Sequence, residues 1–451
     1  MSTTTSGSTN PGRPAANSAA PGAWSNWAGN QTARPRRTVA PASVEELAAA
    51  IRGAAEDGLP VKAVGSGHSF TAIAATDGVL VTPERLTAVR EIDHKGGTVT
   101  VESGLPLEKL NVLLEHAGLA LTNMGDIMVQ TVAGATSTGT HGTGRTSGSL
   151  AAQIKALEIV LADGTVTRCS PTENAELFAG ARLGLGALGV VSAITFGVEP
   201  AFQLTAFEQP MSFSEVTGRF DELVTENEHF EFYWFPHTEG CSTKRNNRSE
   251  GPAAPLPPFK KWLDDDFISN TVWEGACRVG RRFPGTIPTI ARIASKAWSE
   301  RSYTDVSYKV FTSPRRVRFV EMEYAVPREA ATTVLRELKA LVERSGWRIS
   351  FPVEVRVAPA DDLWMSTASE RDTAYIAVHL YRGTVDPGYF TEVEKIMTAH
   401  QGRPHWGKLH TRDAEYLAGV YPHFTEFTAL RDKVDPERRF GNDYLRRVLG
   451  A

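Results

Sequence analysis

The sequence contains little cysteine. Its three cysteines, Cys169, Cys241 and Cys277, are widely spaced, odd in number and free of any C-x-x-C pairing. This pattern argues against a disulfide framework and against a thiolate metal site, so no metal centre is predicted. A reducing compartment fits, and a cytoplasmic location is the default expectation.

An excess of one charge is also absent, as is any long apolar run. Lys and Arg number 48 against 52 Asp and Glu, and nothing in this balance suggests a nucleic-acid or anionic-membrane partner. No run spans a bilayer, so no integral membrane segment is expected, although peripheral association leaves no such trace. Residues 1–22 lack the apolar core of a signal peptide and are predicted to be a disordered tail.

The order of predicted elements indicates an α+β protein. Ser43 and Glu46 form a capping box, so a helix is expected from there to about residue 57. Apolar periodicity and turn residues predict the remaining elements. Strands are expected at 60–64, 78–81, 98–102, 190–198, 229–236, 317–326, 349–357 and 373–381, a hairpin at 156–168, and helices at 106–116, 329–344 and 390–400.

Two segments are expected to be irregular. Residues 122–145 are dense in Gly, Thr, Ser and Ala, which do not favour a helix but suit a close approach of backbone to a ligand. Residues 241–265 are charged and proline-rich, which is typical of an exposed loop.

A dinucleotide-binding pattern occurs at Gly184–Gly189 but in the wrong setting. The letters fit G-x-G-x-x-G, which in a Rossmann fold follows a strand and precedes a helix. Here a predicted helix comes before the glycines and a strand comes after them. We therefore interpret the motif as a tight turn into a strand and reject NAD binding there.

The loop Gly65-Ser66-Gly67-His68-Ser69-Phe70 is more informative. It follows a predicted strand, and its small residues present consecutive backbone N–H groups that can form an anion nest for a pyrophosphate. His68 lies within it. A lone histidine in a loop is usually a satisfied polar residue, so its position alone assigns no function.

Residues 60–70 as a whole resemble the first FAD-binding segment of the vanillyl-alcohol-oxidase or PCMH-type flavoproteins, and in particular the sugar-1,4-lactone and alditol oxidase branch. In that branch the histidine of this loop is bonded to the 8α-methyl group of the flavin. The resemblance therefore implies that His68 carries FAD covalently.

Two further segments are similar to the same family. Residues 123–144 look like its second FAD loop, and residues 186–191 look like its third, which gives the rejected glycine motif a different role. The cofactor contacts implied by the resemblance are Val64, Gly65, Ser66, Gly67, His68, Ser69, Phe70, Asp126, Thr131, Gly134, Thr138, Gly139, Thr140, His141, Val191 and His405.

The C-terminal half supplies candidate catalytic side chains. Strand alternation puts Glu354 and Arg356 on one face, which is equally typical of an exposed ion pair. The resemblance implies instead that this pair lies over the flavin and meets substrate hydroxyls, with arginine donating to a developing alkoxide. His405 and Lys408 match the family's HWxK element, which implies cofactor contact and substrate activation respectively.

His379 and Tyr381 share a strand face and are also candidates for the pocket. The resemblance implies a two-domain fold, with a PCMH-type FAD-binding domain at 24–205, an α+β cap domain at 206–428 whose sheet covers the flavin, and a segment at 429–451 that returns to the first domain.

The implied activity is oxidation of a sugar-1,4-lactone of the L-gulono or D-arabinono type, or alternatively of an alditol such as xylitol. The electron acceptor is O₂ in an oxidase, or a cytochrome or quinone in a dehydrogenase. Two other classes stay open: a hydrolase with Ser137 as nucleophile, because residues 135–139 approach G-x-S-x-G, and a binding protein without catalysis.

Overall fold

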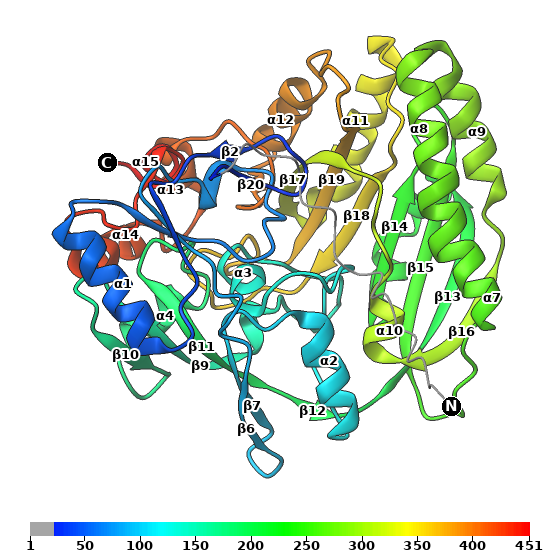
Figure 1. The fold of residues 1–451 in the computed structure, drawn as a ribbon. Coiled ribbons are helices and arrows are strands. Elements are labelled where there is room, and N and C mark those ends of the chain that lie inside the picture. The colour runs from blue at the N-terminus through cyan, green and yellow to red at the C-terminus, as the bar shows by residue number, and fades with distance from the viewer. Residues whose placement is uncertain (1–21) are drawn as a thin grey trace, which may run out of the picture.

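Two sheet systems lie side by side in the computed structural model, which describes residues 22–451 (Figure 1). The predicted tail at 1–22 lies outside the described residues except for Gly22. The N-terminal system has a parallel sheet in the order β3 (Arg37–Val39), β5 (Val79–Val81), β4 (Val61–Ala63). Beside it is an antiparallel sheet of β10 (Val166–Cys169), β9 (Ile154–Val160), β11 (Val190–Gly197), β7 (Thr98–Glu102) and β6 (Val89–Asp93).

Helices from both ends of the chain cover this N-terminal system. The early ones are α1 (Val44–Glu56), α2 (Leu107–His116), α3 (Val132–Ser137) and α4 (Ala175–Ala181). They are joined by α13 (Ala414–Val420), α14 (Phe424–Val434) and α15 (Asp443–Leu449) from the C-terminus. Asn442 fixes the return, because its amide donates to the carbonyls of Ala72, Ile73 and Ala75.

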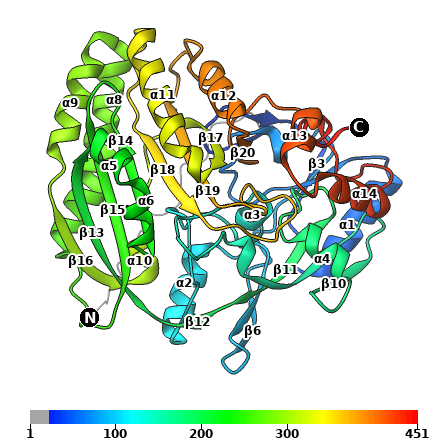
Figure 2. The ribbon, with the colours of Figure 1, turned by 180° about the vertical axis from the view of Figure 1, so that it is seen from behind.

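The second system is one eight-stranded antiparallel sheet. Its order is β16 (Arg301–Val306), β13 (Gln203–Ser212), β15 (Gly240–Ser249), β14 (His229–Trp234), β18 (Val353–Ala358), β19 (Thr373–Tyr381), β17 (Phe319–Pro327) and β20 (Arg403–Pro404). Helices α5 (Phe213–Gly218), α6 (Phe220–Thr225), α11 (Ala331–Ser345) and α12 (Tyr389–Ala399) cover one face, as Figure 2 shows.

Strand alternation sorts the side chains of this sheet into two sets. Phe232, Val355 and Tyr324 belong to the buried cluster under the helices. Their neighbours Glu354 and Glu323 point to the opposite face, because successive side chains in a strand alternate. The central strands are nonetheless buried on both faces, so polar residues on the second face must find partners there.

Several predicted elements are confirmed. Helix α1 begins after Ser43, whose hydroxyl accepts from the Glu46 N–H at 3.2 Å, while the Glu46 carboxylate accepts from the N–H of Ala42. The hairpin β9–β10 forms, and Gly164 at its turn has φ of +80°. The glycine motif at 184–189 is preceded by helix α4 and followed by strand β11, so its reading as a turn is confirmed.

Of the two segments expected to be irregular, residues 122–145 are so outside one short helix, whereas for residues 241–265 the expectation was wrong. Residues 122–145 contain helix α3, because Thr131 caps its first turn and Val132 and Ala135 are fully buried apolar anchors. Residues 241–265 contain most of strand β15, helix α7 (Pro258–Lys261) and the start of a π-helix, η3 (Trp262–Val272). Strand β15 is polar yet pairs with β13 on one side and β14 on the other, so backbone bonding outweighs its loop-like composition.

Helix η3 continues into α8 (Trp273–Arg282), and α9 (Ile287–Ala297) runs beside it at the outer edge of the large sheet (Figure 1). Among residues 22–451 no helix is both long and apolar enough to cross a membrane.

Candidate active site

A cavity with about 1060 Å³ of empty space lies among the loops of the N-terminal system. Ten of the predicted cofactor contacts line it: Val64, Gly65, Ser66, Gly67, His68, Ser69, Thr131, Gly134, Thr138 and Val191. Residues 184–191, the glycine turn and the start of β11, form another part of its wall.

The glycines of the first two loops allow the backbones to lie close together. A Cβ on Gly65 would come within 2.2 Å of the Thr131 hydroxyl, so no side chain is tolerated there. Gly67 has φ of +68°, a conformation that glycine adopts without strain. The cavity is therefore lined mainly by backbone and small side chains in this region, as predicted.

His68 is half-buried and lines one part of this cavity. Its ring stacks on Trp27, with ring centroids 5.2 Å apart. Burial and the nearby cations Lys408 and Arg318 lower the pKa of His68 to about 4. The imidazole is therefore neutral at physiological pH, and a neutral ring retains a nucleophilic nitrogen.

The His68 loop is joined to the predicted HWxK segment by backbone contacts. The N–H of Phe70 donates to the carbonyl of Gly407 at 2.6 Å, and the Thr71 hydroxyl donates to the carbonyl of Trp406 at 3.0 Å. Lys408 Nζ lies 5.4 Å from the centre of the Phe70 ring. These contacts place the candidate catalytic lysine beside the cavity.

Six predicted cofactor contacts do not line the cavity of the structure: Phe70, Asp126, Gly139, Thr140, His141 and His405. The Thr140 hydroxyl accepts from the Gln130 side chain at 3.1 Å, and Gly139 lies against Leu183. The Phe70 ring lies 5.7 Å from that of Phe319, whereas Asp126, His141 and His405 lie beside charged residues of the large sheet.

Glu354 and Arg356 are brought together on β18, as the sequence predicts, but in a buried site rather than an exposed one. Arg356 is in ion-pair contact with Glu354, and its Nε donates to Glu231 on β14 at 3.0 Å. Burial raises the pKa of Glu354. The hydroxyl of Tyr233 donates to Glu354 at 3.1 Å.

Asp126 joins this group from the other side of the site. Its carboxylate lies 2.9 Å from Arg315 and 3.5 Å from Arg356. Burial alone would raise the pKa of Asp126, but Arg356 and Arg315 outweigh it, so that pKa lies below its usual range. The side chain of Asp126 thus contacts Arg356 of the large sheet and Arg315 in the segment before β17.

Lys408 contacts a second carboxylate on the sheet. Its Nζ is in ion-pair contact with Glu321 on β17, and His379 Nε2 lies 3.6 Å from the same carboxylate. Burial would lower the pKa of Lys408, but Glu321 and Glu323 raise it above the usual value. Lys408 is therefore a cation. Tyr381, the other residue proposed for the pocket, instead donates to Glu274 on α8.

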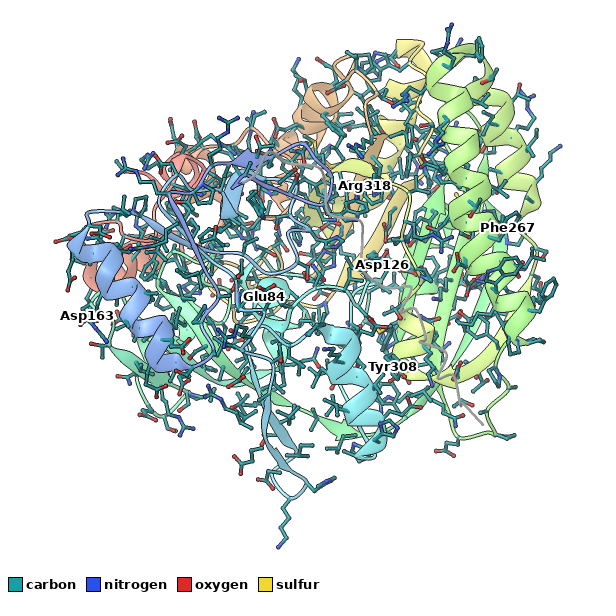
Figure 3. The ribbon with its side chains drawn as sticks, in the orientation of Figure 1. Glu84, Asp126, Asp163, Phe267, Tyr308 and Arg318 are labelled. Carbon is teal, nitrogen blue, oxygen red and sulfur yellow. The ribbon has the colours of Figure 1, made fainter. Side chains whose placement is uncertain are left out.

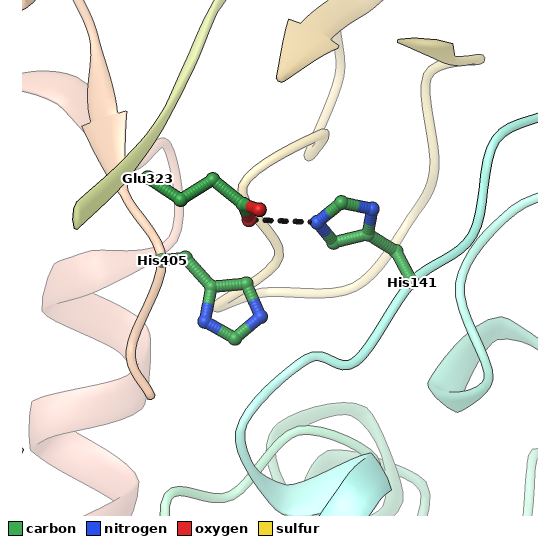
Figure 4. Close-up of side chains that lie close together, drawn as sticks. All are labelled: His141, Glu323 and His405. Carbon is green, nitrogen blue, oxygen red and sulfur yellow. Dashed lines mark hydrogen bonds and ion pairs between the residues drawn. The ribbon is translucent and has the colours of Figure 1, made fainter. Parts of the chain in front are cut away.

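His141, Glu323 and His405 form a third buried group, shown in Figure 4, with ligand-type atoms within 4.8 Å of one another. His141 Nε2 lies 2.8 Å from Glu323 and its Nδ1 lies 2.9 Å from the carbonyl of Gly142. Both ring nitrogens of His141 are therefore engaged by oxygen atoms. Burial lowers the pKa of His405 to about 4, and its Nδ1 accepts from the N–H of Gly407.

These three side chains have the donor types of a metal site, and within the structure the His141 ring is hydrogen-bonded to Glu323. Both ring nitrogens of His141 have hydrogen-bond partners, and Nδ1 of His405 accepts from the N–H of Gly407. The ring of His141 also stacks on Tyr375 with centroids 3.5 Å apart.

Sequence reasoning missed the carboxylates that organise the site, namely Glu231, Glu321 and Glu323, together with Tyr233 and Arg315. The sequence nevertheless contains a pattern from which two of these carboxylates could have been predicted. In the strand at 319–327 the acidic residues alternate with Met322 and Tyr324, just as Glu354 alternates with valines. The pattern that identified Glu354 would therefore have identified Glu321 and Glu323 as well.

Solved structures with the same fold include cholesterol oxidase from Brevibacterium sterolicum. One of its structures superimposes with a TM-score of 0.79 over 95% of this chain and 96% of that chain, at 19% sequence identity. A solvent-stable cholesterol oxidase gives a TM-score of 0.74 at 21% identity, over 95% and 97% of the two chains. At this identity the likeness concerns the fold alone.

Sequence comparison is more specific. The chain is 44% identical to L-gulono-1,4-lactone dehydrogenase of Mycobacterium tuberculosis over 95% of its length and 99% of the relative. It is 34% identical to L-gulonolactone oxidase of Bos taurus, with 94% and 97% covered, and 31% identical to alditol oxidase of a Streptomyces species, with 94% and 98% covered.

Two family profiles divide the chain between them. The FAD binding domain profile matches residues 35–170, which contain the cavity loops at 65–70 and 131–138. The profile of D-arabinono-1,4-lactone oxidase matches residues 194–448, which contain the large sheet and Lys408. The chain therefore belongs to the D-arabinono-1,4-lactone oxidase family and carries its FAD-binding domain.

Proposed function

We propose that this protein is an FAD-dependent oxidoreductase that oxidises a CH–OH group of a sugar-1,4-lactone, of the L-gulono or D-arabinono type, to an ascorbate-type product. One observation carries the proposal: the loop containing His68 lines the cavity and is hydrogen-bonded to the segment that contains Lys408. The candidate cofactor site therefore lies next to a group of charged side chains that suit a polyhydroxylated substrate.

The residues of the cavity fit FAD. Its backbone lining around Gly65 and Gly67 offers N–H groups to a pyrophosphate, and a Cβ at Gly65 or Gly189 would meet other atoms within 3 Å. Ser103 also lines the cavity, and its buried hydroxyl has no hydrogen-bond partner among the described residues. A bound cofactor would supply that partner.

We further propose that the cofactor is attached covalently through His68. A neutral imidazole is required for a ring nitrogen to act as a nucleophile, and the lowered pKa of His68 keeps it neutral across the physiological range. The stacked Trp27 ring restricts the orientation of the imidazole.

The chain contributes binding and charge to the reaction, whereas FAD, when bound, supplies the two-electron acceptor. Lys408 is held as a cation by Glu321, so it donates a hydrogen bond to the substrate oxygen and does not act as a base. Arg356 offers fixed guanidinium donors to the developing alkoxide. Glu354 accepts a hydrogen bond from a sugar hydroxyl and holds Arg356 in place.

The electron acceptor distinguishes two forms of this activity. An oxidase passes electrons to O₂, and a dehydrogenase passes them to a cytochrome or quinone. Hydrogen peroxide production in air, measured beside cytochrome c reduction with the same lactone, separates the two forms.

The substrate class is tested with a panel of aldonolactones and alditols. The proposal predicts turnover of L-gulono-1,4-lactone or D-arabinono-1,4-lactone that exceeds turnover of xylitol. Preferential oxidation of xylitol would instead make the protein an alditol oxidase. The hydrolase alternative is disfavoured, because Ser137 ends the short helix α3 and does not stand between a strand and a helix as a nucleophile elbow requires.

A further inference from the structure

The helical hairpin at the outer edge of the large sheet exposes an unusual amount of apolar surface. We define it as residues 258–298, which include α7, η3, α8 and α9. Fourteen large apolar side chains are exposed among the described residues, and nine belong to or directly adjoin this hairpin, which is less than a tenth of the chain. They are Phe259, Trp262, Phe267, Ile268, Val272, Val279, Phe283, Ile293 and Trp298.

These side chains form continuous surfaces. The rings of Phe259 and Trp262 lie 5.8 Å apart, and those of Trp262 and Phe267 lie 5.5 Å apart. Figure 3 shows Phe267 at the outer edge of the molecule, away from Asp126. Further along, helical spacing puts Val272, Val279 and Phe283 on one stripe. Exposed patches of this kind mark interaction sites.

The charge beside the apolar stripe is of one sign. Residues 275–298 contain five basic side chains and no acidic one. Arg282, Arg292 and Lys296 are exposed and contact no carboxylate among residues 22–451. The guanidinium carbon of Arg282 lies 5.1 Å from the centre of the Phe283 ring, the spacing of a cation–π contact.

The acidic residues of the hairpin do not offset this charge, because they have partners within the fold. Asp264 and Asp265 lie 3.5 Å and 3.1 Å from Arg301, and Asp266 is in ion-pair contact with Arg316. The near-neutral composition of the whole chain therefore conceals a local basic and aromatic surface.

We propose that this hairpin docks on an anionic phospholipid surface. Aromatic side chains enter the interface between head groups and acyl chains, and flanking Arg and Lys pair with anionic lipid. A second copy of the chain is a poorer occupant. A two-fold interface would place each basic patch against its own equivalent, which like charges disfavour.

Docking of this type is peripheral and independent of the proposed oxidation. It requires no spanning helix, and it is compatible with the expected cytoplasmic location because the cytoplasmic leaflet is anionic. The hairpin nevertheless packs near the site: Trp273 contacts Phe351, whose ring lies 5.9 Å from that of His379.

The test uses the FAD-loaded enzyme and co-sedimentation with vesicles of phosphatidylcholine alone or mixed with phosphatidylglycerol. We expect binding to the mixed vesicles that weakens as salt is raised. The triple variant Arg282→Glu/Arg292→Glu/Lys296→Glu should bind about a hundredfold more weakly. The double variant Trp262→Ser/Phe267→Ser should bind about tenfold more weakly because it loses buried apolar area.

Matched controls lie elsewhere on the surface. Lys395→Glu/Lys433→Glu/Arg446→Glu reverses three exposed charges on α12, α14 and α15, and Val385→Ser removes the most exposed apolar side chain outside the hairpin. Both should bind like the wild type, and all variants should keep lactone oxidation.

Three outcomes would overturn the proposal. One is an absence of wild-type binding to the mixed vesicles at low salt. Another is equal loss of binding in the control and hairpin variants. The third is a concentration-dependent dimer in light scattering that the double variant abolishes, which would assign the face to a second copy.

Discussion

The Asp126 carboxylate accepts a hydrogen bond from the Arg315 guanidinium at 2.9 Å across the boundary between the two sheet systems. The same carboxylate lies 3.5 Å from Arg356 on β18. A loop of the N-terminal system thus helps to fix the arginine that we propose as a substrate ligand. The pKa of Asp126 lies below its usual range because Arg356 and Arg315 outweigh the effect of burial, so the carboxylate stays charged.

Removing the charge of Asp126 should lower kcat/KM for the lactone while the protein still folds. In Asp126→Asn the two arginines lose an anionic partner while the side-chain volume is kept. We expect kcat/KM for the lactone to fall by about tenfold to a hundredfold, or about 1.5–3 kcal/mol, as for a lost hydrogen bond to a charged group. Asp163→Asn, in the exposed β9–β10 turn, is the control. Unchanged kinetics in Asp126→Asn would remove this residue from the site.

Glu321 should set the alkaline limit of activity. It raises the pKa of Lys408, and the cation is the form that donates to substrate. In Glu321→Gln the pKa of Lys408 falls, so kcat/KM should decline at a lower pH than in the wild type as Lys408 loses its proton. A pH–rate profile measures this shift, and an alkaline limb that stays in place would contradict the role.

Lys408 itself should be needed for turnover but not for cofactor retention. Lys408→Met keeps an unbranched chain and removes the donor, so turnover should drop by about a hundredfold or more. The visible flavin spectrum should persist. Near-normal turnover would show that another group activates the substrate.

His68 should be the only covalent anchor of the cofactor. Denatured wild-type protein should keep flavin fluorescence on a gel, whereas His68→Ala should release all its FAD on acid precipitation. His94→Ala, at an exposed position, should behave like the wild type. Release of all FAD from the acid-precipitated wild type would refute the covalent link.

Buried His410 should make stability depend on acidity. Burial lowers the pKa of His410 to about 3, below the ordinary value of 6.5, so the unfolded chain binds the proton more tightly. The contribution of neutral His410 to the free energy of unfolding is complete above pH 6.5 and is lost as the pH falls. The loss amounts to about 2 kcal/mol between pH 6.5 and 5. Urea midpoints should thus fall less steeply over this range in His410→Gln than in the control His94→Gln. Equal slopes would contradict the shifted pKa.

Most of the fold was accessible from local sequence patterns. Helix α1 followed from its capping box and β18 from the alternation around Glu354. Strand β15 was not accessible, because its polar run Lys244–Ser249 gives no apolar signal and the strand exists through pairing with β13 and β14. Such pairing is set by distant residues.

The site, too, could be predicted from the sequence only in part. The loop at 65–70 was found because glycines and a histidine stand together in sequence. Glu231 and Glu321 come from two separate strands of the large sheet and Asp126 comes from a loop of the N-terminal system, so these residues meet only in the folded protein. The contacts of the Asp126 side chain with Arg315 and Arg356 could not be predicted, because these arginines are far from Asp126 in the sequence.

The central claim is that a substrate lactone reduces a flavin held in this cavity. The most direct measurement is the absorbance spectrum of the purified protein under anaerobic conditions, before and after addition of L-gulono-1,4-lactone. We expect a yellow protein whose visible flavin band bleaches on addition of the lactone and returns when an acceptor is admitted. A yellow protein that no aldonolactone or alditol bleaches, or a preparation that remains colourless after FAD is supplied, would contradict it.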